Sequence, residues 1–284
     1  MIIDVHSHAG TKVFGAYDFK IDRQWLHEEM KMFDIQKTVI FPYCAPGSYD
    51  ELNRELIESF ADESILPFAR LRFNFKPSDA YKYLTKLKIP GIGKRGYRIL
   101  KEINGRRGIA AYKDEDQEML RFTESMKHCR GIKFHDNQDG HLHEKHFEFL
   151  LSFNKPIVMH INPYKLEYFL SLYEDKVKAP IVIAHLGDCE ADKVHLEKAK
   201  AILKKFDFLY TDTANHVCAN HLVPFMREVP EKVLFGSDGP VISQGSIKGL
   251  MLQCSRELYK NTDGVLKQVS QNTAAFCRKS GWES

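Results

Sequence analysis

Short apolar runs alternate with longer segments of helical spacing along most of the chain. The apolar runs are rich in Val, Ile and Phe and lie at 1–8, 37–44, 65–73, 131–136, 156–161, 180–186, 207–213 and 232–238. The segments of helical spacing lie at 21–34, 50–62, 115–128, 143–153, 164–174, 191–205, 217–228, 245–259 and 263–279. This alternation is typical of βα units, in which helices cover both faces of a parallel sheet. It predicts an α/β fold, a single (β/α)8 TIM barrel over residues 1–284, with an open doubly wound sheet as the alternative.

The spacing between the third and fourth apolar runs breaks this repeat. Residues 74–130 separate the two runs, whereas connections within a βα unit are much shorter. Segment 76–112 is therefore predicted to be a flap inserted between strands three and four. Because the loops after barrel strands form the face that carries active sites, this segment is either a lid or a solvated surface excursion.

The composition narrows the class of protein. Apolar residues make up 43% and charged residues 28%, and the net charge of +3 gives no reason to expect nucleic acid or an anionic membrane as a partner. The six cysteines form no CxxC pair, which argues against a disulfide framework or a zinc ribbon. No secretory signal or apolar run of ~20 residues is present. We expect a cytoplasmic protein with a small-molecule substrate, and the sequence leaves open whether it forms a homo-oligomer.

Histidine and aspartate residues lie near the ends of four predicted strands. His6 and His8 are two positions apart in the first run, so both side chains lie on one face, and His160, His185 and Asp238 end the fifth, sixth and eighth runs. A barrel brings the carboxyl ends of its strands to one mouth, where these five side chains converge. Imidazole and carboxylate donors of this number suit a catalytic site for zinc or a similar divalent ion.

Each histidine also has a structural interpretation. A single histidine at a strand end, such as His160 or His185, is more often a core residue with satisfied nitrogens. The pair of His6 and His8 in an apolar strand is more specific, because burying two imidazoles without partners costs several kcal/mol. Together the strand ends favour a metal site.

Five stretches of the chain carry a resemblance to a known family. They are "DVHSH" at the start, "PIVMHINP", "IVIAHLGD" and "VLFGSDGP" at later strand ends, and "QVSQNTAAFC" at 268–277. Together they resemble the amidohydrolase superfamily, in particular the amidohydrolase-2 group. That group includes metal-dependent hydrolases and enzymes similar to aminocarboxymuconate-semialdehyde decarboxylase.

The resemblance implies a role for each of these residues. His6, His8 and His160 are metal ligands, and Asp238 is a further ligand that exchanges a proton with the metal-bound water or the product. His185 is either a ligand of a second metal or a partner that hydrogen-bonds the water or the substrate. A bound zinc lowers the pKa of its water from 15.7 to about 7. We expect one divalent ion, with zinc favoured and manganese or a second metal left open.

Strand four holds a lysine whose role the sequence does not decide. Binuclear members of the superfamily carry a carboxylated lysine there, and Lys133 lies in the corresponding stretch "GIKFHD". Because Lys133 and His135 are two residues apart, both point into the barrel. We expect them to line the substrate pocket, where a free lysine neutralises a substrate carboxylate, with a core role as the alternative.

These features predict a metal-dependent hydrolase that acts on an amide, ester or lactone bond of a small molecule. The alternatives are a metal-dependent decarboxylase of a small carboxylic acid, a TatD-like nuclease and a non-catalytic metal-binding protein. Asp4 shares the strand face of His6 and His8 and is expected to orient the histidines. Asp212 is expected to lie at the entry of a helix, with orientation of a ligand histidine as the alternative. His141, His143 and His146 are expected to be solvated on a polar helix.

Overall fold

The computed structural model describes residues 2–10, 21–43, 48–73, 115–136, 138–187, 192–216, 218–240, 243–261 and 263–282. The predicted insertion at 76–112 lies outside these residues. The strands form one parallel sheet in the order of the sequence. They are β1 (Ile3–Ala9), β2 (Lys37–Pro42), β3 (Ile65–Arg70), β4 (Gly131–His135), β5 (Ile157–His160), β6 (Ile181–Ile183), β7 (Leu209–Asp212) and β8 (Val233–Leu234).

The segment after β8 brings the end of the sheet back to its beginning. The backbone N–H of Val5 donates to the carbonyl of Phe235 at 2.8 Å, and that of His8 donates to the carbonyl of Gly239 at 2.7 Å. The last strand therefore continues alongside β1. This closure confirms the predicted (β/α)8 barrel and excludes the open doubly wound sheet.

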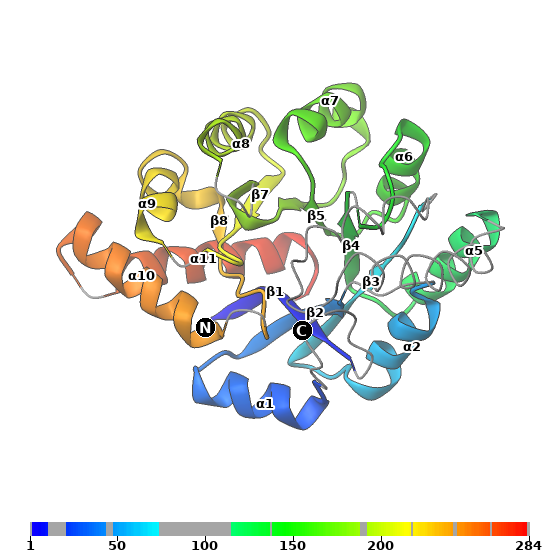
Figure 1. The fold of residues 1–284 in the computed structure, drawn as a ribbon, viewed down its shortest axis with the longest axis horizontal. Coiled ribbons are helices and arrows are strands. Elements are labelled where there is room, and N and C mark those ends of the chain that lie inside the picture. Colours follow the sequence, from blue (N-terminus) through cyan, green and yellow to red (C-terminus); the bar gives the residue numbers. More distant parts are fainter. Residues whose placement is uncertain are drawn as a thin grey trace, which may run out of the picture.

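Helices surround the strands on the outside of the barrel (Figure 1). They are α1 (Arg23–Met32), α2 (Asp50–Ser59), α5 (Glu115–Met126), α6 (Glu144–Ser152), α7 (Pro163–Tyr173), α8 (Lys193–Lys205), α9 (Ala219–Glu228), α10 (Gln244–Tyr259) and α11 (Gly264–Lys279), with short 3-10 turns η1 (Glu174–Lys176), η2 (His185–Gly187) and η3 (Pro230–Lys232). Side chains of Asp22, Asn162, Asp192 and Ser243 cap four of these helices at their first turns. No described helix is long and apolar enough to cross a membrane.

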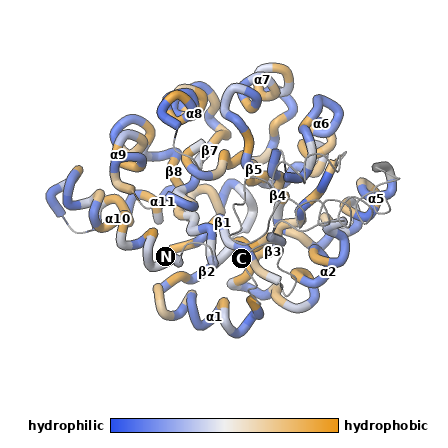
Figure 2. The backbone as a smooth tube through the Cα atoms, viewed as in Figure 1, coloured by the Kyte–Doolittle hydropathy of each residue, from blue (hydrophilic) through white to orange (hydrophobic). Residues whose placement is uncertain are grey.

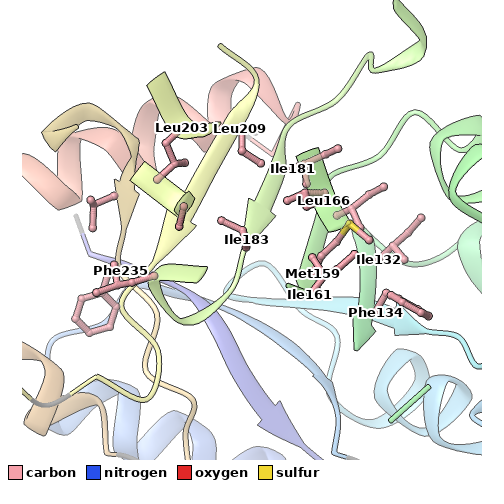
Figure 3. Close-up of a cluster of buried hydrophobic side chains, with 14 of the residues drawn as sticks. Ile132, Phe134, Met159, Ile161, Leu166, Ile181, Ile183, Leu203, Leu209 and Phe235 are labelled. Carbon is pink, nitrogen blue, oxygen red and sulfur yellow. The ribbon is translucent and has the colours of Figure 1, made fainter. Parts of the chain in front are cut away.

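The hydrophobic core has two layers because residues alternate along each strand. The outer layer packs strands against helices and includes Ile132, Phe134, Met159, Ile161, Leu166, Ile181, Ile183, Leu203, Leu209 and Phe235 (Figure 3). The helices carry both hydrophobic and hydrophilic residues (Figure 2), as expected for segments with one buried face. Burial of the outer layer thus fixes which residues of each strand point into the barrel.

The inner layer fills the barrel below the strand ends. It contains Val5, Val39, Leu66, Val158, Val182 and Leu234. Phe276 and Trp282, from α11 and the residues after it, join this layer, and the Trp282 ring centre lies 5.4 Å from that of Phe68. The side-chain amide of Asn272 on α11 donates to the carbonyls of Pro230 and Val233 at the start of β8, at 2.6 and 2.8 Å. The C-terminal residues therefore close the amino-terminal end of the barrel. The polar strand ends lie at the opposite mouth.

Candidate metal centre

His6 and His8 enter the mouth of the barrel from the end of β1. The register between β1 and β2 shifts between Asp4 and Ser7, so the irregularity lies in the part of β1 that contains His6. Both are buried, at 0% and 7% exposed. Their ring centres lie 5.8 Å apart. The His-x-His spacing therefore presents two imidazoles to one cavity.

Asp238 reaches the same point from the segment after β8. Its backbone has a φ of 66°, which turns the side chain towards β1, and its N–H donates to the carbonyl of His6 at 2.8 Å. Asp238 Oδ1 lies 3.3 Å from Nε2 of His6 and 3.1 Å from Nε2 of His8. Burial alone would raise the pKa of Asp238, but the adjacent imidazoles of His6 and His8 hold that pKa well below its ordinary value.

Asp212, at the end of β7, holds two of the histidines at once. Its Oδ2 accepts a hydrogen bond from Nδ1 of His6 at 2.8 Å, and its Oδ1 accepts from the backbone N–H of His185 at 2.8 Å. Burial works against ionisation, yet interactions with His6 and His185 lower the pKa of Asp212 to about 2. The expected helix-entry role is wrong, because α9 begins at Ala219. A carboxylate on Nδ1 leaves the lone pair of His6 on Nε2, where a metal ligand needs it.

Asp4 does not line the cavity with His6 and His8, and its carboxylate contacts Gln244 of α10 instead. Its carboxylate accepts hydrogen bonds from the hydroxyl of Ser237 at 2.6 Å, the side chain of Gln244 at 2.9 Å and the backbone N–H of His6 at 3.1 Å. It contacts neither imidazole of the His-x-His pair in these bonds. The irregularity in β1 shifts the alternation, so Asp4 supports the backbones of β1 and of the segment after β8 rather than the rings.

His185 follows β6 in a strained turn. His185 and Leu186 have φ values of 60° and 52°, which non-glycine residues rarely adopt and which concentrate at functional sites. Nδ1 of His185 lies 3.1 Å from the carbonyl oxygen of Ala214, so this nitrogen donates and Nε2 keeps a lone pair. Burial lowers the pKa of His185 to about 4, which makes it neutral at pH 7.

Lys133, His135 and His160 line the cavity beside this group. Lys133 Nζ lies 3.2 Å from Nε2 of His6, and burial lowers the pKa of Lys133 to about 7. The His160 ring centre is 4.7 Å from that of His185 and 3.8 Å from that of His135. Burial also lowers the pKa of both His135 and His160 well below the ordinary value, so both are neutral bases at pH 7.

Three of the residues named from the sequence form a compact donor group. One ligand atom each from His6, His8 and Asp238 lies within 4.8 Å of the other two. Donors held tetrahedrally at bond lengths of 2.0–2.1 Å lie about 3.3 Å apart, and the distances from Asp238 Oδ1 to the two imidazoles match this value. The donor set and spacing thus fit a divalent metal.

His160 is not part of that group, although it shares the cavity. A second group of His6, His185 and Asp212 also satisfies the 4.8 Å criterion. However, the Asp212 oxygens already accept from His6 Nδ1 and from backbone N–H groups, so this residue acts as an orienting carboxylate. Among the described residues, His6, His8 and Asp238 are the set best placed to ligate one ion.

The cavity contains residues that the sequence analysis missed. Its volume is about 170 Å³, and besides the residues already named it is lined by Tyr43, Arg70, Gln138 and Asn215. Arg70 could have been suspected from the sequence, because it is a charged residue inside the apolar run 65–73. Tyr43 follows β2 directly and lies within the predicted run 37–44, whereas Gln138 and Asn215 lie in loops, where no periodicity indicates them.

One expectation about the remaining histidines is also wrong. His146 is fully buried, and its ring stacks on Phe73 with the ring centres 4.0 Å apart. His141 and His143 are exposed, as expected for a polar helix start. His146 lies on the buried face of α6, which the sequence assigned to solvent because its neighbours are charged. It belongs to the packing between α6 and the barrel.

Comparisons with known proteins identify the fold. No protein-family model matches the chain, and no curated protein matches it in sequence. The structure is similar to a probable 2-pyrone-4,6-dicarboxylic acid hydrolase from Acinetobacter baumannii with citric acid bound, at 12% identity over 99% of each chain and a TM-score of 0.60. It is also similar to a zinc-bound amidohydrolase from Burkholderia multivorans, at 12% identity over 99% of each chain and a TM-score of 0.58.

A decarboxylase shares the same architecture. The 5-carboxyvanillate decarboxylase from Sphingomonas paucimobilis matches at 10% identity over 98% of each chain, with a TM-score of 0.51. These neighbours are hydrolases and decarboxylases of one superfamily. The chain therefore has the barrel fold of amidohydrolase-superfamily enzymes, and the resemblance seen in its sequence is confirmed at the level of the fold.

Proposed function

We propose that this chain is a metal-dependent hydrolase of the amidohydrolase superfamily, which cleaves an amide, ester or lactone bond of a small molecule. The observation that carries the proposal is the donor group of His6, His8 and Asp238 at the mouth of a parallel barrel. The group is buried and opens into a cavity, as a catalytic rather than a structural site requires. The bound zinc of the Burkholderia multivorans amidohydrolase supports zinc as the ion.

Each side chain around this centre has a separate role in the proposed reaction. When bound, a zinc ion supplies Lewis acidity and acidifies a water molecule. Asp238, whose low pKa keeps it ionised, accepts a proton at a carboxylate oxygen and returns it to the leaving group. His185 offers the lone pair of Nε2 to the water or to a substrate hydroxyl, while Lys133 and His135 contact the substrate from β4.

Decarboxylation of a small carboxylic acid is the second candidate. It is favoured by the cationic groups Lys133 and Arg70 on the cavity wall, which suit a substrate carboxylate. The structural likeness to 5-carboxyvanillate decarboxylase supports it too. Both reactions use the same donor group, and they differ in whether a substrate carboxyl group leaves as CO2.

Metal analysis tests the shared part of both proposals. Protein purified without a histidine tag should contain close to one equivalent of divalent metal, and added zinc should raise the Tm of chelator-treated protein. Turnover of small lactones, esters, amides and carboxylic acids, with CO2 detection, then separates the two reactions. Asp238→Asn should abolish either activity. Protein that holds no metal and gains no stability from zinc would contradict the proposal.

A further inference from the structure

Two basic side chains, Arg70 and Lys133, lie next to each other on the wall of the cavity. The two residues are register partners in the neighbouring strands β3 and β4, and both line the cavity that holds the donor group. Arg70 is 1% exposed and Lys133 is 2% exposed. Because neighbouring strands lie only about 4.8 Å apart, these two side chains share one region of the cavity wall.

Arg70 is held rigidly by acceptors on three sides. Its Nε donates to the carboxylate of Asp139 at 2.9 Å, its Nη1 donates to the carbonyl of Pro42 at 3.0 Å, and its Nη2 donates to Oε1 of Gln138 at 2.9 Å. Its guanidinium carbon lies 4.9 Å from the centre of the Tyr49 ring. An arginine fixed in this way loses little conformational entropy when a ligand arrives.

Asp139, which anchors Arg70, is itself fixed from other elements. The hydroxyl of Tyr49 donates to Asp139 Oδ1 at 2.9 Å, and the backbone N–H of His135 donates to Oδ2 at 2.8 Å. Asp139 is fully buried. It does not line the cavity, whereas Arg70 does, so the guanidinium is the member of this ion pair that faces a ligand.

Gln138 marks the position where a ligand oxygen fits. It lines the cavity, and its amide oxygen accepts from Arg70 Nη2 at a wall that also carries Lys133. An ionised oxygen at that position makes a shorter and stronger bond to a guanidinium than a neutral amide oxygen does. A carboxylate oxygen can therefore compete with the amide oxygen of Gln138 for Nη2 of Arg70.

We propose that Arg70, with Lys133 beside it, forms an anion subsite that binds a carboxylate of the substrate, separate from the bond that reacts at the metal centre. The planar fork of an arginine matches a carboxylate in size and geometry, and the small cavity favours this group. This inference rests on the proposed function, because it names the class of substrate that would react at the same metal centre. It predicts that the substrate is a small carboxylic acid or a lactone that carries one.

Malonate binding to the full chain, treated with a chelator, tests the subsite without the metal as a competing ligand. Isothermal titration at constant ionic strength should show saturable binding of malonate that chloride does not reproduce. Arg70→Met should weaken the affinity ~10–100-fold, because a hydrogen-bonded charged partner is lost. Arg70→Lys should bind more weakly than the wild type, since it keeps the charge but loses the fork. The control Arg227→Met removes an exposed arginine on α9 and should leave binding unchanged.

Gln138→Leu provides a test that does not disturb Arg70. Without the competing amide oxygen, malonate should bind more tightly than to the wild type, so the proposal stays testable if Arg70→Met fails to fold. Unchanged binding in Arg70→Met, unchanged binding in Gln138→Leu, or tighter binding of phosphate than of malonate would each overturn it. Protein that binds malonate through Arg70 but takes up no zinc would contradict only the proposed function.

Discussion

A single carboxylate links three strands of the candidate metal centre. Asp212 orients the ring of His6 and holds the backbone of His185, so a substitution of Asp212 affects the positions of both histidines. In Asp212→Asn the amide oxygen still accepts from the backbone of His185, but an NH2 group faces Nδ1 of His6. The ring then carries its proton on Nε2. We expect zinc affinity to fall ~10–100-fold.

Competition with a chelating dye measures this loss directly. Asp136→Asn is a matched control, since Asp136 is also buried but bonds Lys165 and the backbone of Leu142 instead of the donor group. Zinc affinity at the wild-type level in Asp212→Asn would show that the tautomer of His6 does not depend on this carboxylate.

Glu29, on α1, is expected to make the stability of the fold depend on pH. Burial and the nearby Asp4 raise the pKa of Glu29 from 4.5 to about 7. Because the folded-state pKa lies above the unfolded value, ionised Glu29 destabilises the fold above about pH 7, and the penalty disappears as pH falls towards 4.5. Glu29→Gln should therefore raise Tm at pH 8.5 by about 2 °C, since the group is partly exposed.

Thermal unfolding at two pH values checks this effect. The gain from Glu29→Gln should shrink at pH 5.5, where the wild-type carboxyl is mostly protonated in the fold. Glu28→Gln, one residue earlier and exposed, should show little change at either pH. An equal gain at both pH values would mean that the charge of Glu29 is not the cause.

The positions of some site residues could be predicted from the sequence, and those of others could not. The spacing of His6 and His8 placed both on one face, because strand alternation holds over two residues. The same rule failed for Asp4, since an irregularity inside β1 separates it from the histidines. The role of Asp212 depends on side-chain distances between β7 and β1, which a single sequence does not encode in any spacing.

At the scale of elements, β1, β7 and the segment after β8 approach one another closely at Gly236. A Cβ added there would lie 2.9 Å from Cβ of His6 and 3.0 Å from Cβ of Asp212, closer than real Cβ atoms pack. Gly236→Ala must therefore push apart the two side chains that share a 2.8 Å hydrogen bond. We expect a destabilisation of about 1–3 kcal/mol and a loss of zinc affinity.

Gly249→Ala on α10 is the matched substitution, because an added Cβ there meets nothing within 4 Å. In the middle of a helix it should stabilise the protein by up to about 1 kcal/mol. Denaturant unfolding and zinc titration of both variants measure the contrast. Wild-type zinc affinity in Gly236→Ala would show that the strands adjust around the methyl group.

Element boundaries were harder to predict than element types. The run at 232–238 was expected to be one strand, but β8 covers only Val233–Leu234 in the ladder with β7. The remaining residues bond to β1 instead, and Asp238 leaves the extended conformation with a positive φ. Hydrophobicity identifies the whole buried run. The switch of its hydrogen-bond partner from β7 to β1 depends on closure of the barrel, which hydrophobicity does not indicate.

At the scale of the whole molecule, closure made the site predictable. Residues 6 and 238 are distant in sequence, and only a closed parallel barrel brings their strands side by side. The eight βα units counted in the sequence were enough to predict this closure. The orientation of Arg70 was not predictable, because its guanidinium is held by Asp139 and Gln138 on a loop after β4.

The far end of the barrel supplies a test of global stability that is separate from the site. Trp282 is 6% exposed and packs against Phe68 and Phe276, with ring centres 5.4 and 5.3 Å away. Trp282→Ala removes a large side chain from the inner core, which typically costs about 3–5 kcal/mol. A chain of this size should then lose ~10 °C in Tm.

Trp282→Phe should lose much less, because an aromatic ring still fills the end of the barrel. Since the donor group lies at the opposite mouth, zinc stoichiometry of the folded fraction should stay at the wild-type value in both variants. Differential scanning calorimetry and metal analysis of the same samples measure the two quantities. A Tm unchanged in Trp282→Ala would mean that the C-terminal residues do not close the barrel, whereas lost zinc at wild-type stability would mean that the two ends are coupled.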